Sequence, residues 1–304
     1  KQITTDGTSL YVADQNNHKI RKIVISTGVV TTLAGSGSSG STDGTSARFN
    51  GPRGITTDGT NLYVADTANH KIRKIALIGN VNAGVALHNL DDEINVTVNL
   101  ASSDTGEATV SPATLTFTGN NWNTAQTVTL SGVNDNDRDR HQDYKISLSS
   151  ADQKTDSPEV STFAGSPSGS TSSGSTNATG TSARFQSPHG ITSDGTNLYV
   201  ADSNNHTIRK IVISTGAVTT LAGYPGSYGS SNATGISARF NYPIGITTDG
   251  TNLYVVDLNN HMIRKIVIST GVVTTIAGST TSGSTDGIRT SARFYYPRGI
   301  TTDG

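Results

Sequence analysis

Short apolar runs alternate with turn residues along most of the chain. In the first 35 residues these runs are rich in Val, Ile, Thr and Tyr, and turn signals such as Asp6-Gly7 and Ser26-Thr27-Gly28 separate them. No apolar run approaches the roughly 20 residues that a membrane-spanning helix needs. The pattern predicts four short β-strands, at Gln2–Asp6, Leu10–Asp14, Lys19–Ile25 and Val29–Ala34.

The same pattern returns three more times and is marked by one motif. The motif reads ADQNNHKIRKI at Ala13–Ile23, and its later copies stand at Ala65–Ile75, Ala201–Ile211 and Val256–Ile266. His18 and His70 lie 52 residues apart, and His206 and His261 lie 55 apart. Four adjacent strands repeated at this period are typical of β-propeller blades. We therefore predict an all-β fold with four blades, and a closing RGITTDG segment (Arg298–Gly304) that begins a further blade.

One repeat carries an insertion. His70 and His206 lie 136 residues apart, and the fourth strand expected for blade two appears only at Val160–Gly165. The insertion therefore lies at the tip of a strand hairpin, where the chain ends are close and exposed. Its apolar and polar residues alternate, which predicts an antiparallel β-sandwich with strands at Ile94–Leu100, Ala113–Thr118, Ala125–Val133 and Tyr144–Ser150. The expected domains are residues 1–77, 78–159 and 160–304, the first and third forming one propeller.

Two family resemblances follow from these motifs. The LYVAD strand followed by Asn-His and Ile-Arg-Lys resembles the NHL repeat, which implies a propeller. Each copy also carries a VTTLAG-type strand and the tetrapeptide SARF (first at Ser46–Phe49), which is similar to the Ser/Gly-rich bacterial branch of that family. The run SSDTGEATVSPATLTFTGNNWNTAQTVTLSGVNDND resembles bacterial Calx-β-like surface domains, which implies an immunoglobulin-like fold for the insertion.

Composition narrows the function classes. The 304 residues include 22 basic and 23 acidic side chains, and the net charge of −1 gives no general attraction to nucleic acid. Cysteine is absent, so neither disulfides nor thiol chemistry contribute. A Cys-free chain rich in Ser, Thr, Gly and Asn indicates a bacterial extracellular or cell-surface protein. Because the chain begins inside a repeat, we expect its N-terminus to be mature or truncated.

Several polar residues recur in every blade. These are Asp14, His18 and Arg21, then Asp66, His70 and Arg73, then Asp202, His206 and Arg209, then Asp257, His261 and Arg264. Adjacent strands can bring each Asp and Arg together as a charge-assisted hydrogen bond. We expect each His to bond within its own turn. Repetition in every blade indicates a scaffold role, because a unique active site would break the repeat.

Other positions differ between copies and are the candidate ligand-binding residues. The innermost strands are preceded by NGPRG, QSPHG, NYPIG and YYPRG. These segments should face one mouth of a central channel, where Arg, His and Tyr suit sugars, carboxylates or peptide groups. Alternatively, these positions differ only because the sequence drifts on an exposed loop. The candidates are Arg53, His189, Tyr242, Ile244, Tyr296 and Arg298.

A metal site is a further candidate. The acidic run NDNDRDRHQD includes Asp135, Asp137 and Asp139, whose oxygens suit Ca²⁺. The resemblance to Calx-β domains implies calcium binding through acidic loops, whereas Arg138 and Arg140 oppose it. A solvated turn is the alternative. No other cofactor is expected.

These observations support three functional hypotheses. The first is a non-enzymatic extracellular structural or interaction protein, which contacts protein partners or itself through its terminal strands and inserted domain, as in a surface filament. The second is a propeller that recognises a surface glycan or protein. The third is an enzyme like the lyases that share this scaffold, although no nucleophile elbow, HExxH motif or phosphate loop is present.

Overall fold

The computed structural model describes residues 2–77, 96–102, 108–118, 126–132, 146–150, 158–167 and 172–303. The chain divides into two compact units. One consists of Lys1–Ile78 with Ser157–Gly304, and the other of Gly79–Asp156. No helix in the described ranges has the length and apolarity needed to cross a membrane.

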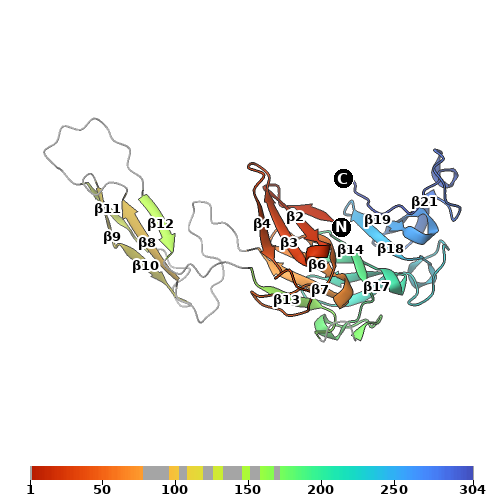
Figure 1. The fold of residues 1–304 in the computed structure, drawn as a ribbon, viewed down its shortest axis with the longest axis horizontal. Helices are drawn as coiled ribbons and strands as arrows, with labels where there is room; N and C mark the ends of the chain where they lie inside the picture. The colour runs from red at the N-terminus through yellow and green to blue at the C-terminus, as the bar shows by residue number, and fades with distance from the viewer. Residues whose placement is uncertain are drawn as a thin grey trace. The chain divides into compact units, whose positions relative to one another are not determined.

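The first unit contains four antiparallel sheets of four strands, which are the blades (Figure 1). Blade one consists of β1 (Ile3–Thr5), β2 (Ser9–Asp14), β3 (Lys19–Val24) and β4 (Val30–Ala34). Blade two consists of β5 (Pro52–Thr57), β6 (Asn61–Asp66), β7 (Lys71–Ala76) and β13 (Val160–Ala164). Blade three consists of β14 (Pro188–Ser193), β15 (Asn197–Asp202), β16 (Thr207–Val212) and β17 (Val218–Ala222). Blade four consists of β18 (Pro243–Thr248), β19 (Asn252–Asp257), β20 (Met262–Val267) and β21 (Val273–Gly278).

The turn between the first two strands of a blade is fixed by an aspartate. In blade two, Asp58 Oδ1 accepts hydrogen bonds from the backbone N–H groups of Thr60 (2.9 Å) and Asn61 (2.6 Å). Its other oxygen accepts from the hydroxyl of Tyr63 at 3.0 Å. Burial opposes ionisation of this carboxyl, but the hydrogen bonds from Asn61 and Thr60 outweigh it and lower the pKa of Asp58. The repeated sequence TDGTNLY is therefore a turn in which the Asp replaces missing backbone partners.

The turn between the second and third strands is a single 3₁₀ turn that ends on the repeated histidine. The four turns are η1 (Gln15–Asn17), η2 (Thr67–Asn69), η5 (Ser203–Asn205) and η7 (Leu258–Asn260). Each following His has a left-handed backbone, with φ between 52° and 58°. The loops that lead to the next blade carry further 3₁₀ turns, η4 (Gly180–Ser182), η6 (Gly235–Ser237) and η8 (Arg289–Ser291).

The core lies between neighbouring blades, so most strands are covered on both faces. The cluster between blades one and two contains Tyr11, Ile20, Phe49 and Ile55, and the SARF residues Ala47 and Phe49 are 1% and 0% exposed. These two residues therefore pack between the blades. Burial on two faces explains why runs such as TIRKIV in blade three do not alternate cleanly.

Glycine in the innermost strands permits adjacent blades to approach. A Cβ on Gly54 would lie against the carbonyl oxygen of His189, and one on Gly190 would lie against that of Ile244. The motif Pro-x-Gly-Ile-Thr therefore requires Gly because the neighbouring backbone occupies the space of a side chain. Gly299 holds the equivalent position after β21, and a Cβ there would meet nothing within 4 Å among the described residues.

The C-terminal segment differs from its prediction. We expected Arg298–Gly304 to be the first strand of a further blade, but residues 297–303 form no strand. The segment nevertheless runs beside β18, because the Arg298 carbonyl lies against Gly245 and Ile300 packs with Ile244 and Val256. A first strand takes its hydrogen bonds from the second strand of its own blade, and the described residues contain none for this segment.

The second unit contains β8 (Val96–Ser102), β9 (Ala108–Ser111), β10 (Thr114–Phe117), β11 (Thr129–Gly132) and β12 (Ile146–Ser150). They form two antiparallel sheets, with strand orders β10-β8-β12 and β11-β9. Val98, Leu100, Leu115 and Phe117 are buried, and Val110 and Val128 pack against them. The strand β9 was not predicted, because its run ATVS is short and has one bulky apolar residue. The immunoglobulin-like identity of this unit stays a prediction.

A glycine pair tests the inner-strand packing. Gly190→Ala should lower the free energy of unfolding by about 3 kcal/mol, because a methyl group forced against a backbone carbonyl overpacks the contact. Gly299→Ala should cost less than about 0.5 kcal/mol, since the space there is open. Urea denaturation measures both values. Equal losses in the two variants would show that close approach of blades is not the reason for the glycine.

Candidate functional site

A buried ion pair links the second and third strands of three blades. Arg73 Nη1 lies 3.0 Å from Asp66 Oδ2, and the pairs Arg209–Asp202 and Arg264–Asp257 are 2.9 and 2.8 Å long. All six side chains in these three pairs are 0% exposed. In blade one, Arg21 and Asp14 are 3.6 Å apart, with 31% and 27% of their side chains exposed.

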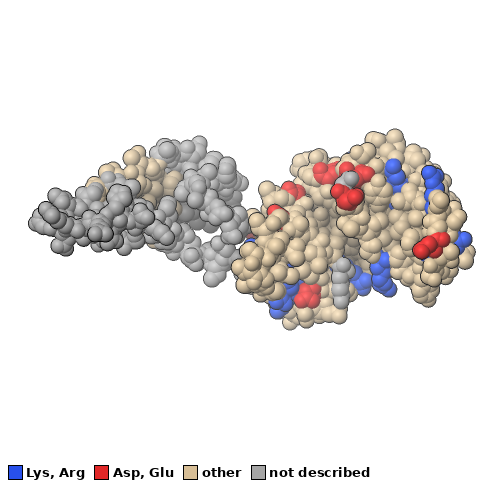
Figure 2. All heavy atoms as spheres, turned by 90° about the horizontal axis from the view of Figure 1, so that it is seen from above, with Lys and Arg blue, Asp and Glu red and all other residues tan. Residues whose placement is uncertain are grey.

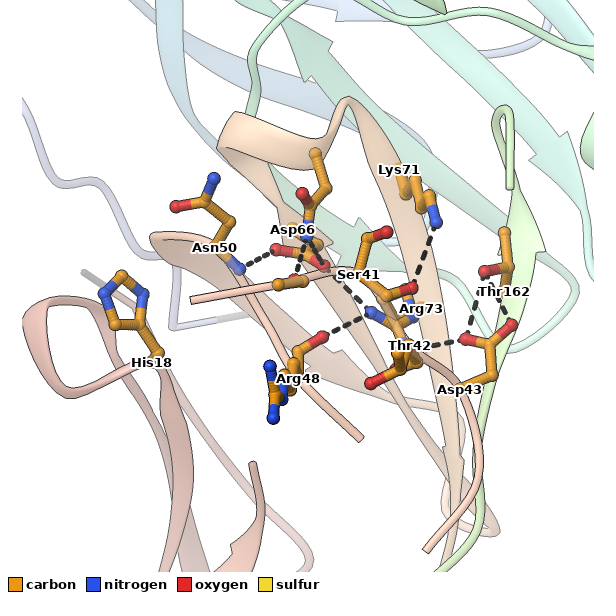
Figure 3. Close-up of polar contacts among 12 residues, drawn as sticks. His18, Ser41, Thr42, Asp43, Arg48, Asn50, Asp66, Lys71, Arg73 and Thr162 are labelled. Atoms are coloured by element: carbon orange, nitrogen blue, oxygen red, sulfur yellow. Dashed lines mark hydrogen bonds and ion pairs between the residues drawn. The ribbon is translucent and has the colours of Figure 1, made fainter. Parts of the chain in front are cut away.

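Each buried arginine also binds the loop that enters its blade. Arg73 donates to the carbonyls of Arg48 (2.9 Å) and Thr42 (2.7 Å) and to a carboxylate oxygen of Asp43 (2.6 Å) (Figure 3). Its guanidinium carbon lies 5.1 Å from the centre of the Phe49 ring. Asn177 and Asn232 replace Asp43 in the next two blades. The arginine is therefore the centre of an interlock between a blade and its entering loop.

The aspartate of this interlock is held by three structural hydrogen bonds. Asp202 accepts from Gln186 N (2.7 Å), Asn205 Nδ2 (2.7 Å) and Arg209 Nη1 (2.9 Å). Burial raises the pKa of Asp202 to about 6, although the charge of Arg209 and these hydrogen bonds oppose that shift. Because its oxygens are occupied and shielded from solvent, a scaffold role fits this residue better than a role as nucleophile or base.

The repeated histidines bond within their own turns and also hold the segment that follows the next loop. As predicted, the backbone N–H of each His donates within its own turn, for example from His18 to the Gln15 carbonyl at 3.3 Å. Each ring Nδ1 also accepts from the backbone N–H that precedes the proline after the next loop, and this bond was not predicted. The four bonds are Gly51 to His18 (3.2 Å), Ser187 to His70 (2.9 Å), Tyr242 to His206 (3.1 Å) and Tyr296 to His261 (3.2 Å). For His70 and His206, burial lowers the pKa, which favours the neutral ring that can accept this bond.

Positions that differ between copies meet at one cavity of about 450 Å³. The innermost strands and the C-terminal segment contribute Arg53, His189, Ile244 and Arg298 to its wall. Gln2 also lines it and bridges two blades, because its side-chain amide donates to the Ile191 carbonyl at 2.9 Å. Gln2 was not among the predicted residues, although it occupies a position that is Gly in the other copies. We call this cavity the channel mouth.

The two candidate tyrosines lie outside this wall. Tyr242 packs against His189, with ring centres 5.5 Å apart and 3.5 Å between its hydroxyl and Nε2. Tyr296 packs against His261 instead, with ring centres 4.7 Å apart. Both have a left-handed backbone, with φ of 61° and 48°, at the position held by Gly51 in the first copy.

His189 is neutral at neutral pH. Burial, with a smaller contribution from the positive charges of Arg53 and Arg298, lowers the pKa of His189 to about 3. The side chain is 8% exposed. His189 therefore offers a hydrogen-bonding ring to the channel mouth without adding a third positive charge.

Metal binding has no support from the part of the chain that the structure describes. No group of three or more His, Cys, Asp or Glu side chains within those ranges is placed to hold an ion. Asp135, Asp137 and Asp139 lie outside the described residues. Calcium in the inserted unit stays a prediction.

Comparison with known proteins identifies the repeat. The NHL repeat family matches residues 185–211. NHL repeat-containing protein 2 of Bos taurus is 30% identical over 98% of this chain and 43% of its own length. The chain thus spans about two fifths of the curated relatives it matches. Among solved structures, an auxiliary nutrient binding protein from Bacteroides ovatus is 13% identical, with a TM-score of 0.44 over 98% of this chain and 62% of that one.

A second solved structure is that of virginiamycin B lyase from Staphylococcus aureus. It is 19% identical, with a TM-score of 0.34 over 90% of this chain and 68% of that chain. The chain is an all-β protein that carries an NHL repeat in four-stranded propeller blades.

A matched pair of variants tests the interlock. Asp202→Asn should lower the free energy of unfolding by about 3–5 kcal/mol, because it leaves the Arg209 charge buried without a counterion. Asp14→Asn removes the partly exposed equivalent and should cost less than about 1 kcal/mol. Denaturant titration at pH 7 compares them, and similar losses would contradict the role assigned to burial.

The buried histidine predicts a pH dependence. Because the folded pKa of His189 is about 3 against 6.5 for the free side chain, the folded state binds fewer protons. Its contribution to stability is therefore complete above about pH 6.5 and declines as the pH falls towards 3. Between pH 8 and pH 5 the loss should be about 2 kcal/mol. The measurement is the difference between wild type and His189→Asn in urea at both pH values, and parallel pH profiles would refute it.

Proposed function

We propose that this chain is a non-enzymatic interaction protein that acts outside the cell or at its surface. The proposal rests on the observation that two sets of polar side chains have different surroundings. The repeated Asp, His and Arg residues are used in contacts within and between blades. The residues that differ between copies at the channel mouth, Arg53, His189, Ile244 and Arg298, take no part in those contacts and line a cavity. A rigid repeated scaffold with a varied rim suits recognition rather than a fixed chemical step.

The surface charge agrees with a partner other than nucleic acid. Figure 2 shows the Lys and Arg side chains of the propeller unit in separate small groups on the visible face, without a continuous basic surface. A phosphate backbone is normally bound by such a continuous basic patch. Proteins and glycans are therefore the partner classes that we propose.

A binding panel tests this function. Labelled chain is applied to an array of bacterial surface glycans and extracellular proteins, and each bound component is recovered for mass spectrometry. We expect saturable binding to at least one component, with the mass of that component unchanged. Covalent alteration of the bound component would show an enzyme, and the absence of any saturable binding would reject the interaction role.

Unequal blade faces favour self-association as a second candidate. Val30 is 50% exposed, whereas its equivalents Val160, Val218 and Val273 are 1–2% exposed. Val160 of blade two is covered by the loop of residues 36–50, and no loop among the described residues covers Val30 of blade one in the same way. Conversely, Phe294 is only partly buried, whereas Phe49, Phe185 and Phe240 are 0% exposed. We propose that the loop around Phe294 of a second copy covers Arg21 and Val30, which would build a filament.

Light scattering over a concentration series tests self-association. The chain should form oligomers at tens of micromolar, and Val30→Asp or Phe294→Ala should shift it to monomer, because each removes one half of the contact. Val272→Asp, at another exposed valine, is the control and should not change the mass. A wild-type chain that stays monomeric would exclude a second copy as the covering partner and leave further repeats of the same polypeptide.

A further inference from the structure

Two arginines at the channel mouth lack counterions. Arg53 and Arg298 form no ion pair or side-chain hydrogen bond with any described residue, whereas Arg73, Arg209 and Arg264 are all paired. None of the described residues that line the channel mouth is Asp or Glu. Two positive charges that share a concave wall without a carboxylate produce a positive potential there, since the low-dielectric wall screens them less than water does.

Threonine hydroxyls form a second, neutral feature of the same cavity. The threonine that follows Ile near the start of each innermost strand or of the C-terminal segment lines the cavity, and these residues are Thr4, Thr56, Thr192, Thr247 and Thr301. The next residue in blade two, Thr57, donates its hydroxyl to the Asn61 carbonyl within its own blade. Thr4, Thr56, Thr192 and Thr247 make no such bond with any described residue. Their hydroxyls can therefore donate to and accept from a ligand.

The cavity has the size and polarity of a small-molecule site. Its volume of about 450 Å³ lies within the ~300–1,000 Å³ that such sites span. The guanidinium group matches a carboxylate in a planar, bidentate arrangement, which a lysine cannot reproduce. His189 adds a neutral ring beside the Tyr242 hydroxyl.

We propose that the channel mouth binds a carboxylate-bearing sugar, with its carboxylate at Arg53 and Arg298 and its hydroxyl groups at the threonines. This inference rests on the proposed function and names the ligand class of the same rim. A neutral sugar leaves both guanidinium charges unpaired, so it binds more weakly. An inorganic anion uses the arginines but none of the threonine hydroxyls, so it also binds more weakly than the acidic sugar.

Calorimetry with galacturonate, galactose and inorganic phosphate tests the site. Wild type should bind galacturonate at least tenfold more tightly than galactose or phosphate. The double variant Arg53→Gln/Arg298→Gln should lose at least tenfold in galacturonate affinity. The control Lys210→Gln/Lys265→Gln removes the same charge from the third strands of blades three and four and should bind as wild type does.

Each alternative result has a definite meaning. Unchanged galacturonate binding in the arginine variant, or no binding to wild type, overturns the inference. Phosphate binding as tight as galacturonate binding also overturns it, because the hydroxyl groups would then contribute nothing. The variant Thr56→Val/Thr192→Val should weaken galacturonate binding and leave phosphate binding unchanged. If the acidic sugar fails while another component of the binding panel binds, the inference falls and the interaction function stands.

Discussion

The fold depends on a charged group that is buried where two pieces of chain meet. Arg73 and its equivalents bind the aspartate of their own blade and the carbonyl oxygens of the entering loop at once. Burying a guanidinium is costly unless its N–H groups are paired. In the three buried arginines, which lie in the described part of the chain, both Nη atoms have partners and only Nε has none. A loop without regular structure is thereby fixed by contacts to its backbone carbonyls together with one Asp or Asn side chain and one Phe ring.

This arrangement explains which parts of the molecule vary. The loop residues 36–50 bind the arginine through carbonyl groups, the Asp43 carboxylate and one aromatic ring, and none of these contacts uses a serine side chain. The glycines of the loop are constrained, because Gly37 and Gly44 have a positive φ and a Cβ on Gly40 would overlap Arg48. The innermost strands are constrained at glycine by the next backbone and at proline by the turn, whereas the residue between them faces the channel mouth. Arg53, His189, Ile244 and Arg298 occupy that single unconstrained place.

Much of this structure could be predicted from the sequence, because local rules are repeated four times. The Asp-Gly turns and the strand periods indicated the blades, and the seven-residue spacing of Asp66 and Arg73 fits adjacent strands. The histidine partners could not be predicted, because each donor lies 33–117 residues away and is a backbone N–H that any residue carries. The threonine hydroxyls were missed because they recur in every copy, as scaffold residues do. The packing of Tyr242 on His189 and of Tyr296 on His261 could not be predicted either, and the role of the two tyrosines in ligand binding stays a prediction.

The interlock also determines which segment of this protein can be duplicated or exchanged as a unit. The loop before a blade is held by that blade's arginine, while its phenylalanine packs against the glycine that ends the preceding blade, as Phe49 does between Gly35 and Arg73. A duplicated or exchanged segment is therefore self-sufficient only if its boundaries fall just after a fourth strand and it keeps its entering loop. Recombination at the apparent blade boundary, directly before β5, β14 or β18, would separate an arginine from the carbonyls that neutralise it. The segment that can be exchanged as a unit therefore begins one loop earlier in the chain than the four-stranded blade does.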